Sequence, residues 1–556
     1  MEAKVERIEE ASGGAFAPLR EKTFRTIWAT SLFSNFGQLI LGVGAAWEMT
    51  RLTSSASMVA LVQTALMIPL MLIAVPAGAI ADMFDQRKTA LAGLGFSISC
   101  SALLTVLMML GYSSPWLLLI FCSLIGAGVA LFGPAWQASI REQVSPEQLP
   151  AAVALGSVSY NVARSFGPAL GGLIVAAAGA QAAFGVTAVS YIPLFAAFFI
   201  WKRSYVPARL PPERIDRAIL SGGRYAFHSP PIRNVLGRAL LFGLASASYS
   251  ALAPLIARDL LHGNASTFGL LLCAAGVGAV AGAFAISSVR ERFTTEAAVR
   301  ACIVASALAL VIVGLSQNVA LTCFGFFVIG GTNILSVGLL NVTVQLSAPR
   351  WVTARALSLF SSALTGGIAA GAIIWGQVAQ AWGIQITILV SALAVLVSMV
   401  AGLRRPLPET TLTGVELVEI RGEPDVALDL TLRSGPVTIE IDYSVDPAKA
   451  RDFYDIMRKV RRIRQRNGGF NWSIARDIAD PALWTERYEC PTWGDYLRMR
   501  GRLTESDRDV QALADSFHMR GDHPRVRRKL VRPYGSVRWR AESLDPRNDN
   551  IGLMVP

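Results

Sequence analysis

The chain has 556 residues, of which 53% are hydrophobic and only 16% charged, and its formal net charge is +12. Soluble chains carry about 25% charged residues, so this composition excludes an ordinary soluble globular protein. The basic residues alternate with long apolar runs and form no basic patch, so no nucleic-acid partner is expected.

Charge is distributed unevenly along the chain. Residues 1–405 hold 26 Lys and Arg against 15 Asp and Glu, whereas residues 406–556 hold 25 against 24. The basic excess therefore belongs to the apolar part, as it does in membrane proteins, which retain Lys and Arg in cytoplasmic loops. The sequence predicts a membrane-embedded part followed by a polar tail.

A polar segment over residues 1–23 precedes twelve apolar runs, each long enough to cross a bilayer as a helix. The predicted spans are Phe24–Met49, Ser57–Ala81, Thr89–Leu110, Trp116–Ile140, Ala151–Ala178, Ala182–Trp201, Val235–Arg258, Phe268–Val289, Val299–Leu315, Val319–Leu346, Ala354–Gln380 and Ile384–Leu403. They form two predicted six-helix halves, residues 24–201 and 235–403, joined by a polar cytoplasmic loop over 202–234.

Orientation follows from the loops. With both termini in the cytoplasm, 23 basic residues of the membrane part lie inside, and two, Arg51 and Arg258, lie outside. This asymmetry predicts a multi-pass protein of the cytoplasmic (inner) membrane, surrounded by the lipid bilayer, with both ends in the cytoplasm.

Glycines recur at a fixed offset of 204 residues. The offset pairs Gly78 with Gly282, Ile125-Gly126 with Ile329-Gly330, Gly167 with Gly371, Gly172 with Gly376, and Gly179 with Gly383. We therefore expect an internal duplication. Two parallel six-helix repeats around a site at the membrane midplane are a transporter architecture.

The loop after the second predicted span reads Gly78-Ala-Ile-Ala-Asp82-Met83-Phe-Asp85-Gln-Arg87-Lys88. It resembles the signature loop of the major facilitator superfamily, Gly-x-x-x-Asp-basic-x-Gly-basic-basic. Met83 and Asp85 depart from that pattern. The residues that match it are Gly78, Asp82, Arg87 and Lys88. The copy in the second half is degenerate, because Ile286 stands where the acid would be.

The fifth predicted span contains Gly167-Pro168-Ala-Leu-Gly171-Gly172, which resembles a motif of antiporters in this superfamily. With the run from Phe132 to Leu149, and with Asn161 and Arg164, it resembles the enterobactin-exporter-like, or transmembrane secretion effector, branch. The resemblance implies a secondary exporter of a small amphipathic or anionic metabolite, siderophore or drug. Gly78, Gly167, Pro168, Gly171 and Gly172 are expected to pack helices, because small residues let helices approach closely in membranes.

Arg164 lies midway along the fifth predicted span, where a charge is costly unless it faces a cavity or a partner. We expect it to bind an anionic substrate; the alternative is a structural pairing with backbone carbonyls and Asn161. The predicted substrate-binding side chains are Arg164, Asn161, Gln137, Asn333 and Asn341. The last three amides line the cavity or, alternatively, bridge helices.

Energy coupling is expected to come from a gradient, because the sequence has no Walker-type nucleotide loop. The predicted coupling and gating residues are Glu48, Asp82, Arg87, Lys88 and Asp259. Arginine does not change charge near physiological pH. The proton carrier is therefore expected among the three carboxylates or on the substrate itself, with a uniporter as the alternative.

The tail is predicted to follow a linker over 404–436 and to fold over residues 437–543 in the order βαββαβ, a ferredoxin-like unit. Thr492 with Asp495, and Thr504 with Asp507, are predicted to open two helical segments of the tail as capping boxes. It resembles the dimeric α/β barrels related to antibiotic-biosynthesis monooxygenases, which implies a homodimer formed through the tail. His518 and His523 lack a partner constellation, so we expect no catalysis, and the cysteines show no metal-ligand spacing. No cofactor or metal is predicted. The rival hypotheses are a membrane-tethered monooxygenase and a receptor or scaffold.

Overall fold

The structure is a computed structural model that describes residues 16–83, 85–145, 148–201, 223–349, 352–404, 407, 426–428, 430–519 and 523–531. Residues 1–15 of the predicted N-terminal segment and most of both predicted linkers lie outside these residues, as do the end of the tail and the side chains of residues 74–84. The chain divides into two compact units. One is a helical bundle; the other holds residues 216–233, 343–357 and the tail.

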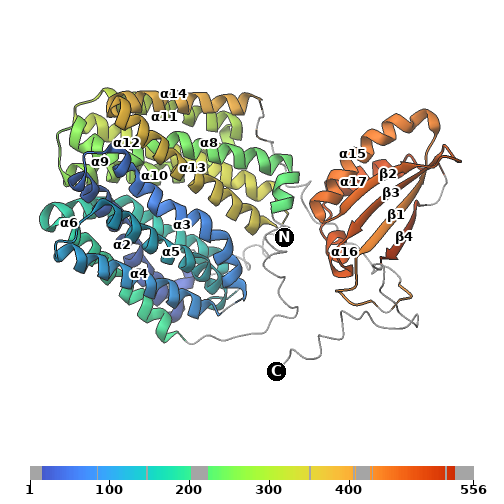
Figure 1. The fold of residues 1–556 in the computed structure, drawn as a ribbon, viewed down its shortest axis with the longest axis horizontal. Helices are drawn as coiled ribbons and strands as arrows, with labels where there is room; N and C mark the ends of the chain where they lie inside the picture. The colour runs from blue at the N-terminus through green and yellow to red at the C-terminus, as the bar shows by residue number, and fades with distance from the viewer. Residues whose placement is uncertain are drawn as a thin grey trace, which may run out of the picture. The chain divides into compact units, whose positions relative to one another are not determined.

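Helices build the first unit, and most of them are long (Figure 1). They are α2 (Lys22–Leu52), α3 (Ala56–Met83), α4 (Gln86–Met109), α5 (Pro115–Ser139), α6 (Leu149–Ile200), α8 (Pro230–Ala251), α9 (Ala253–Leu255), the π-helical turn η3 (Ile256–Leu260), α10 (Ala265–Arg292), α11 (Thr295–Leu315), α12 (Val319–Ser347), α13 (Thr353–Trp382) and α14 (Ile384–Arg404). Within the described residues, nine helical segments are long and apolar enough to cross a membrane. This gives the fold of a multi-pass membrane protein.

Several helices begin at polar caps that the sequence supplies. Asp85 accepts hydrogen bonds from the backbone N–H groups of Arg87 and Lys88 at the start of α4. Asn264 and Thr267 form a capping box that opens α10. The aspartate that departs from the signature loop therefore has a local structural reason.

The glycine offset of the sequence coincides with repeated geometry. Gly179 breaks the 52-residue α6, and Gly383 separates α13 from α14; both have a φ of +79°. Only glycine adopts this conformation without strain. The Cβ position of Gly126 lies 3.1 Å from the carbonyl oxygen of Leu66 on α3, and its counterpart Gly330 packs in the same way on Ala275 of α10.

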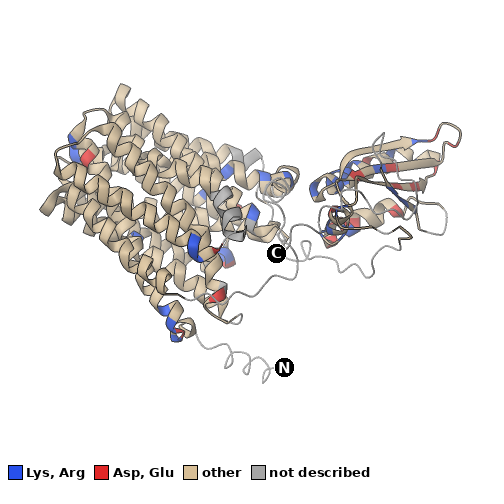
Figure 2. Cartoon of the chain, turned by 60° about the horizontal axis from the view of Figure 1, so that its bottom comes forward, with Lys and Arg blue, Asp and Glu red and all other residues tan. Residues whose placement is uncertain are grey.

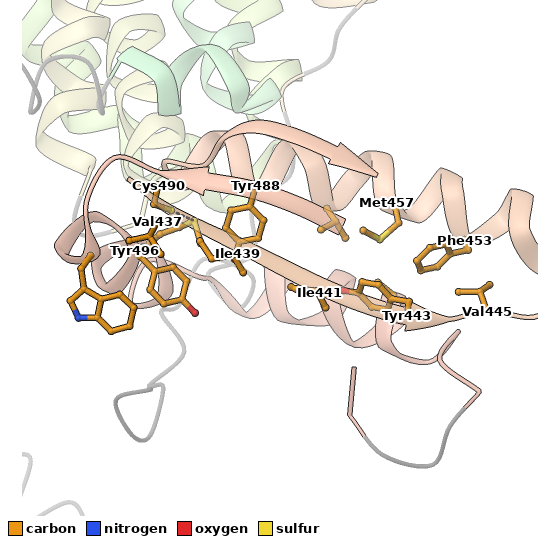
Figure 3. Packing of buried hydrophobic residues seen from close by; sticks show 14 residues of the cluster. Val437, Ile439, Ile441, Tyr443, Val445, Phe453, Met457, Tyr488, Cys490 and Tyr496 are labelled. Atoms are coloured by element: carbon orange, nitrogen blue, oxygen red, sulfur yellow. Dashed lines mark hydrogen bonds between the residues drawn. The ribbon is translucent and has the colours of Figure 1, made fainter. Parts of the chain in front are cut away.

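The C-terminal domain is a four-stranded antiparallel sheet with helices. Its elements are β1 (Val437–Ser444), α15 (Ala450–Asn467), β2 (Phe470–Arg476), β3 (Leu483–Cys490), α16 (Trp493–Arg500), α17 (Glu505–Asp515) and β4 (Arg525–Leu530), and the strand order is β2-β3-β1-β4. Alternate residues of β1 enter one core with Phe453 and Met457 of α15 (Figure 3). The predicted starts of α16 and α17 are confirmed, because Thr492 and Thr504 are their N-caps.

Candidate functional site

The two halves of the bundle meet at the end where α2 finishes and α10 begins, which we call the distal end. Trp47 of α2 stacks on Phe268 of α10 with ring centroids 6.3 Å apart. Arg258 of η3 donates to the Thr50 carbonyl of α2 at 2.7 Å. Aromatic stacking and a charged hydrogen bond therefore close the distal end.

Contacts between the halves continue to the middle of the bundle. Thr64 of α3 donates to the carbonyl of Ala369 on α13 at 3.0 Å. Ser165 of α6 donates to the carbonyl of Gly276 on α10 at 3.1 Å, and this glycine's Cβ position lies only 2.5 Å from the Ser165 Cα. The close approach of backbones at this depth leaves no room for a side chain at Gly276.

Arg164 lies next to this contact, at the interface of the halves. Its half-buried side chain lies close enough to the hydroxyl group of Tyr249 on α8 to interact with it electrostatically. The Tyr249 ring packs edge-on against Phe326 of α12, with centroids 6.0 Å apart. A cation at mid-depth thus faces a neutral hydroxyl and aromatic carbon, an arrangement that can accept an anion.

The predicted amides lie on three helices. Asn161 of α6 donates to the carbonyl of Ser157, one turn earlier in its own helix, at 2.9 Å. Gln137 of α5 is exposed, and Asn333 and Asn341 of α12 are half-buried. Sequence reasoning missed Tyr249, because a tyrosine in an apolar span carries no motif that separates it from packing residues.

The signature loop has an observed contact through its arginine. Arg87 donates to the carbonyls of Phe198, at 2.9 Å, and of Phe199 at the end of α6. A cation at the C-terminus of a helix is favoured by the helix dipole. Gly78 and Asp82 belong to α3, but their surroundings lie outside the part that the structure describes.

The two remaining predicted carboxylates lie near the distal end with arginine partners. Glu48 is 5% exposed and accepts from Arg51 at 3.1 Å. Asp259 accepts from Arg258 at 3.0 Å, and that arginine also bonds to Thr50. Asp259 and Thr50 therefore hold the same guanidinium, which lies in the contact between the halves.

A second charge cluster ties three elements of the C-terminal half together. Glu296 of α11 accepts from Arg238 of α8 at 2.7 Å and from Arg300 at 2.8 Å. It also accepts the backbone N–H of Leu407 at 3.0 Å. The chain that leaves α14 toward the tail is thereby fixed to α8, a connection that sequence reasoning missed.

The glycine motif of α6 lies against two helices. The Cβ positions of Gly167 and Gly171 are 3.1 Å from Leu39 and Val43 of α2, respectively. That of Gly172 is 2.7 Å from the carbonyl oxygen of Ala265 on α10. Residues larger than glycine would push α6 away from both neighbours.

The tail histidines differ in their surroundings. Nδ1 of His518 accepts the backbone N–H of Ser444 at 2.9 Å, which ties it to the end of β1, whereas His523 is exposed. In the part of the chain that the structure describes, no group of three or more His, Cys, Asp or Glu could hold a metal.

Comparisons with known proteins agree with this geometry. The model of the transmembrane secretion effector family matches residues 13–534. The staphyloferrin A transporter of Staphylococcus aureus (strain NCTC 8325 / PS 47) is 26% identical over 46% of this chain, which spans 64% of that protein's length. The enterobactin exporter EntS of Citrobacter koseri is 26% identical over 64% of this chain and 84% of its own length.

Two further comparisons extend over most of the bundle. The multidrug efflux pump Tap of Mycolicibacterium fortuitum is 22% identical over 66% of this chain and 91% of its own. A bacterial homologue of the lysosomal transporter Spinster, solved in an inward-facing, unoccupied conformation, gives a TM-score of 0.55 at 13% identity, covering 69% of this chain and 96% of that chain. The predictions of a membrane transporter fold, and of a transporter rather than an enzyme, are confirmed. The chain belongs to the transmembrane secretion effector family of membrane transporters.

Proposed function

We propose that this transporter exports a small anionic or amphipathic molecule by alternating access, with proton entry as the driving force. The observation that carries the proposal is Arg164, a cation at mid-depth that meets Tyr249 at the interface of the halves. A substrate carboxylate or phenolate would replace the neutral hydroxyl with a charged acceptor, which binds a guanidinium more strongly. The exporter and efflux pump among the relatives support the direction.

The proposal includes twelve spans in two six-helix halves, with Gly179 dividing α6 into two spans. Both termini would be cytoplasmic and the membrane the inner one, so the distal end would face outside; the 23-to-2 distribution of basic residues supports this orientation. The domain boundaries predicted from the sequence are part of the same proposal.

The proposal assigns roles to individual residues. Asn161, Gln137, Asn333 and Asn341 would complete the substrate site around Arg164. Asp82, Arg87 and Lys88 would form a gate, with Arg87 released from the end of α6 in one state. The proton carrier would be Glu48, Asp82 or Asp259, since arginine keeps its charge.

For the tail, we propose a ferredoxin-like domain that pairs with a second copy. Its strand order and one-sided core support the fold. The opposite face of the sheet carries charged pairs, such as Lys529 with Glu440 at 2.7 Å and Arg527 with Asp442 at 2.8 Å. The mass of the detergent-solubilised chain tests this: a dimer that becomes a monomer on truncation at Arg405 is expected, and a monomeric full chain contradicts it.

The test of transport begins by comparing culture medium from a deletion strain and its parent, to find the exported compound. That compound is then supplied to inverted membrane vesicles with an imposed pH gradient. Arg164→Ala is expected to slow transport of an anionic compound by about 10- to 100-fold, because a charged hydrogen bond of about 1.5–3 kcal/mol is lost. Arg164→Lys keeps the charge but loses the planar, two-donor geometry of the guanidinium. Its transport rate is expected to lie between those of the wild type and of Arg164→Ala.

Two outcomes would contradict parts of this proposal. Accumulation that ignores both the pH gradient and a protonophore eliminates proton coupling. Unchanged transport by Arg164→Ala, with the protein present in the membrane, removes this residue from the binding site.

A further inference from the structure

A charged cluster at the end of the bundle opposite to the distal end lies beside an apolar cleft. In the cluster, Glu296 of α11 pairs with Arg238 of α8 and with Arg300 of its own helix. The cleft opens between α8, α11, α12 and α14, and its apolar wall is formed by Leu241, Phe242, Ile303, Leu340 and Met399. Cluster and cleft both belong to the helical unit, so the packing of its helices fixes their arrangement.

Within the cluster, positive charge is in excess. Two guanidinium groups share one carboxylate, and that carboxylate also accepts the backbone N–H of Leu407 at 3.0 Å, so its charge is already compensated. A guanidinium has five N–H donors, so Arg300 can hold Glu296 and an oxygen of a second anion at the same time. The side chain of Arg300 is 36% exposed, against 8% for Arg238. Arg300 is therefore the group that an anion from outside the bundle can reach.

Two helices repeat the same order of charged and apolar residues. Leu241 follows Arg238 on α8, and Ile303 follows Arg300 on α11, each three residues later and so on the same helix face, one turn deeper in the bundle. Arg300 lies five residues beyond the start of α11 at Thr295, which is about 8 Å along the helix. The polar headgroup layer on each side of a bilayer is about 5–8 Å thick. Arg300 therefore lies at the depth of the lipid phosphates, and the apolar cleft lies where the hydrocarbon begins.

The size of the cleft restricts what can occupy it. The room inside is about 20 Å³, enough for one water molecule, so a ligand built of rings does not enter. Leu241 at the mouth of the cleft is 43% exposed, and an extended hydrocarbon chain can lie along this mouth and cover it. An anionic group beside Arg300 and a hydrocarbon chain along the cleft are together the chemistry of an acidic phospholipid.

We propose that the cluster and the cleft form a binding site for a membrane phospholipid of net negative charge. The lipid phosphate accepts hydrogen bonds from Arg300, and one acyl chain covers Leu241 at the mouth of the cleft. Basic pockets between transmembrane helices bind anionic headgroups in this way. In the orientation proposed above, this end of the bundle is cytoplasmic and the lipid belongs to the inner leaflet. The choice of leaflet, but not the site, rests on the proposed function.

Native mass spectrometry of the purified full-length chain in detergent measures lipid binding directly. The chain is titrated with phosphatidylglycerol and, separately, with phosphatidylcholine that carries the same acyl chains. The affinity for phosphatidylglycerol is expected to be about fivefold higher, because one basic residue near the membrane surface favours an anionic lipid by about that factor. Equal affinities for the two lipids overturn the proposal. Displacement of phosphatidylglycerol by an equal concentration of inorganic phosphate also overturns it, because the site would then take a free anion.

Three variants test the role of the arginine. Arg300→Gln is expected to lower the affinity for phosphatidylglycerol about fivefold. Arg292→Gln is the matched control, because Arg292 is an exposed arginine at the end of α10, on the same end of the bundle. Arg300→Lys keeps a cation that binds phosphate as a point charge, so its affinity is expected to stay within about twofold of the wild type. The site is overturned if Arg292→Gln, or Arg300→Lys, loses as much affinity as Arg300→Gln.

A further pair of variants tests the acyl chain. Leu241→Gln is expected to lower the affinity for phosphatidylglycerol about two- to fivefold, because apolar area at the mouth of the cleft is lost. Leu308→Gln is the control, because Leu308 is 61% exposed on α11 but does not line the cleft. Unchanged affinity in Leu241→Gln overturns the cleft as the place of the acyl chain. None of these measurements uses a transported compound, so failure of the lipid site and failure of the proposed export give different results.

Discussion

The helical bundle and the C-terminal domain place their charges differently (Figure 2). In the bundle, charged residues lie mostly near the ends of helices. Arg164, midway along its predicted span, lies near the neutral Tyr249. In the domain, Arg464 and Glu486 pair inside the core at 3.0 Å, with side chains 7% and 0% exposed. The Arg464–Glu486 pair lies inside the core of the domain, whereas Arg164 of the bundle lies next to a neutral tyrosine where the two halves meet.

The difference follows from what stabilises each unit. Lipid is as apolar as leucine, so helices in a bilayer gain from close backbone packing more than from burying apolar surface. The domain buries an apolar core against water, and its ion pair is satisfied by further hydrogen bonds: Trp472 donates to Glu486 at 2.9 Å, and Arg464 donates to Gln511 at 2.6 Å. The buried charges of the domain are therefore structural, whereas the charge at mid-depth in the bundle is the one that we propose to meet the substrate.

The largest effect is expected from breaking the buried pair of the domain. Glu486→Ala leaves Arg464 charged and unpaired in the core, which costs about 3–5 kcal/mol. Protection of β1 and β3 amides against hydrogen exchange should fall accordingly in the full chain.

The matched control is Asp455→Ala, which removes an exposed partner of Arg458 at 3.8 Å and should cost less than about 1 kcal/mol. Equal losses of protection in the two variants would show that the Arg464–Glu486 pair does not stabilise the core of the domain.

A smaller effect is expected from overfilling the bundle. Gly172→Ala places a Cβ 2.7 Å from the Ala265 carbonyl oxygen and 2.8 Å from the Cα of Gly269, so α6 and α10 must separate. Overpacking of this kind costs about 1–3 kcal/mol. The melting temperature of the detergent-solubilised chain should fall.

Gly156→Ala in the same helix meets nothing within 4 Å and serves as the control, with an unchanged or higher melting temperature. Equal melting temperatures for the two variants would show that close backbone packing does not stabilise this bundle.

The smallest effect concerns the polar face of the tail sheet. The hydrogen bond from Lys529 holds the pKa of Glu440 below its ordinary value. Stability from this pair is present above the unfolded pKa of about 4.3 and is lost as pH falls through the lower, folded value. For a surface pair it is at most about 0.5 kcal/mol.

Glu440→Gln should therefore reduce the loss of β4 amide protection on acidification, measured by hydrogen exchange between pH 6 and pH 3. Added salt should reduce the difference between Glu440→Gln and the wild type in this loss of protection. An equally steep loss in Glu440→Gln would show that other groups cause it.

Sequence by itself predicted the features that depend on local pattern. Apolar runs located the helices, because about 20 apolar residues are needed to cross a bilayer. The glycine offset predicted that Gly179 and Gly383 are equivalent, and both adopt a left-handed φ. Thr492 and Thr504 located helix starts in the tail, because an N-cap is satisfied by backbone within three residues.

Tertiary structure alone decided which distant side chains meet. Arg164 was singled out by its depth in the sequence, yet its partner Tyr249 lies on another helix in the other half. Glu486 alternates in phase with Trp484 and Tyr488, which puts this acid on the apolar face of its strand, but only the packing of α15 on the sheet places Arg464 over it. Packing of Tyr225 under Arg466 joins segments that the sequence separates by the whole second half of the bundle. Such pairs depend on how helices and strands pack, which periodicity and caps do not encode.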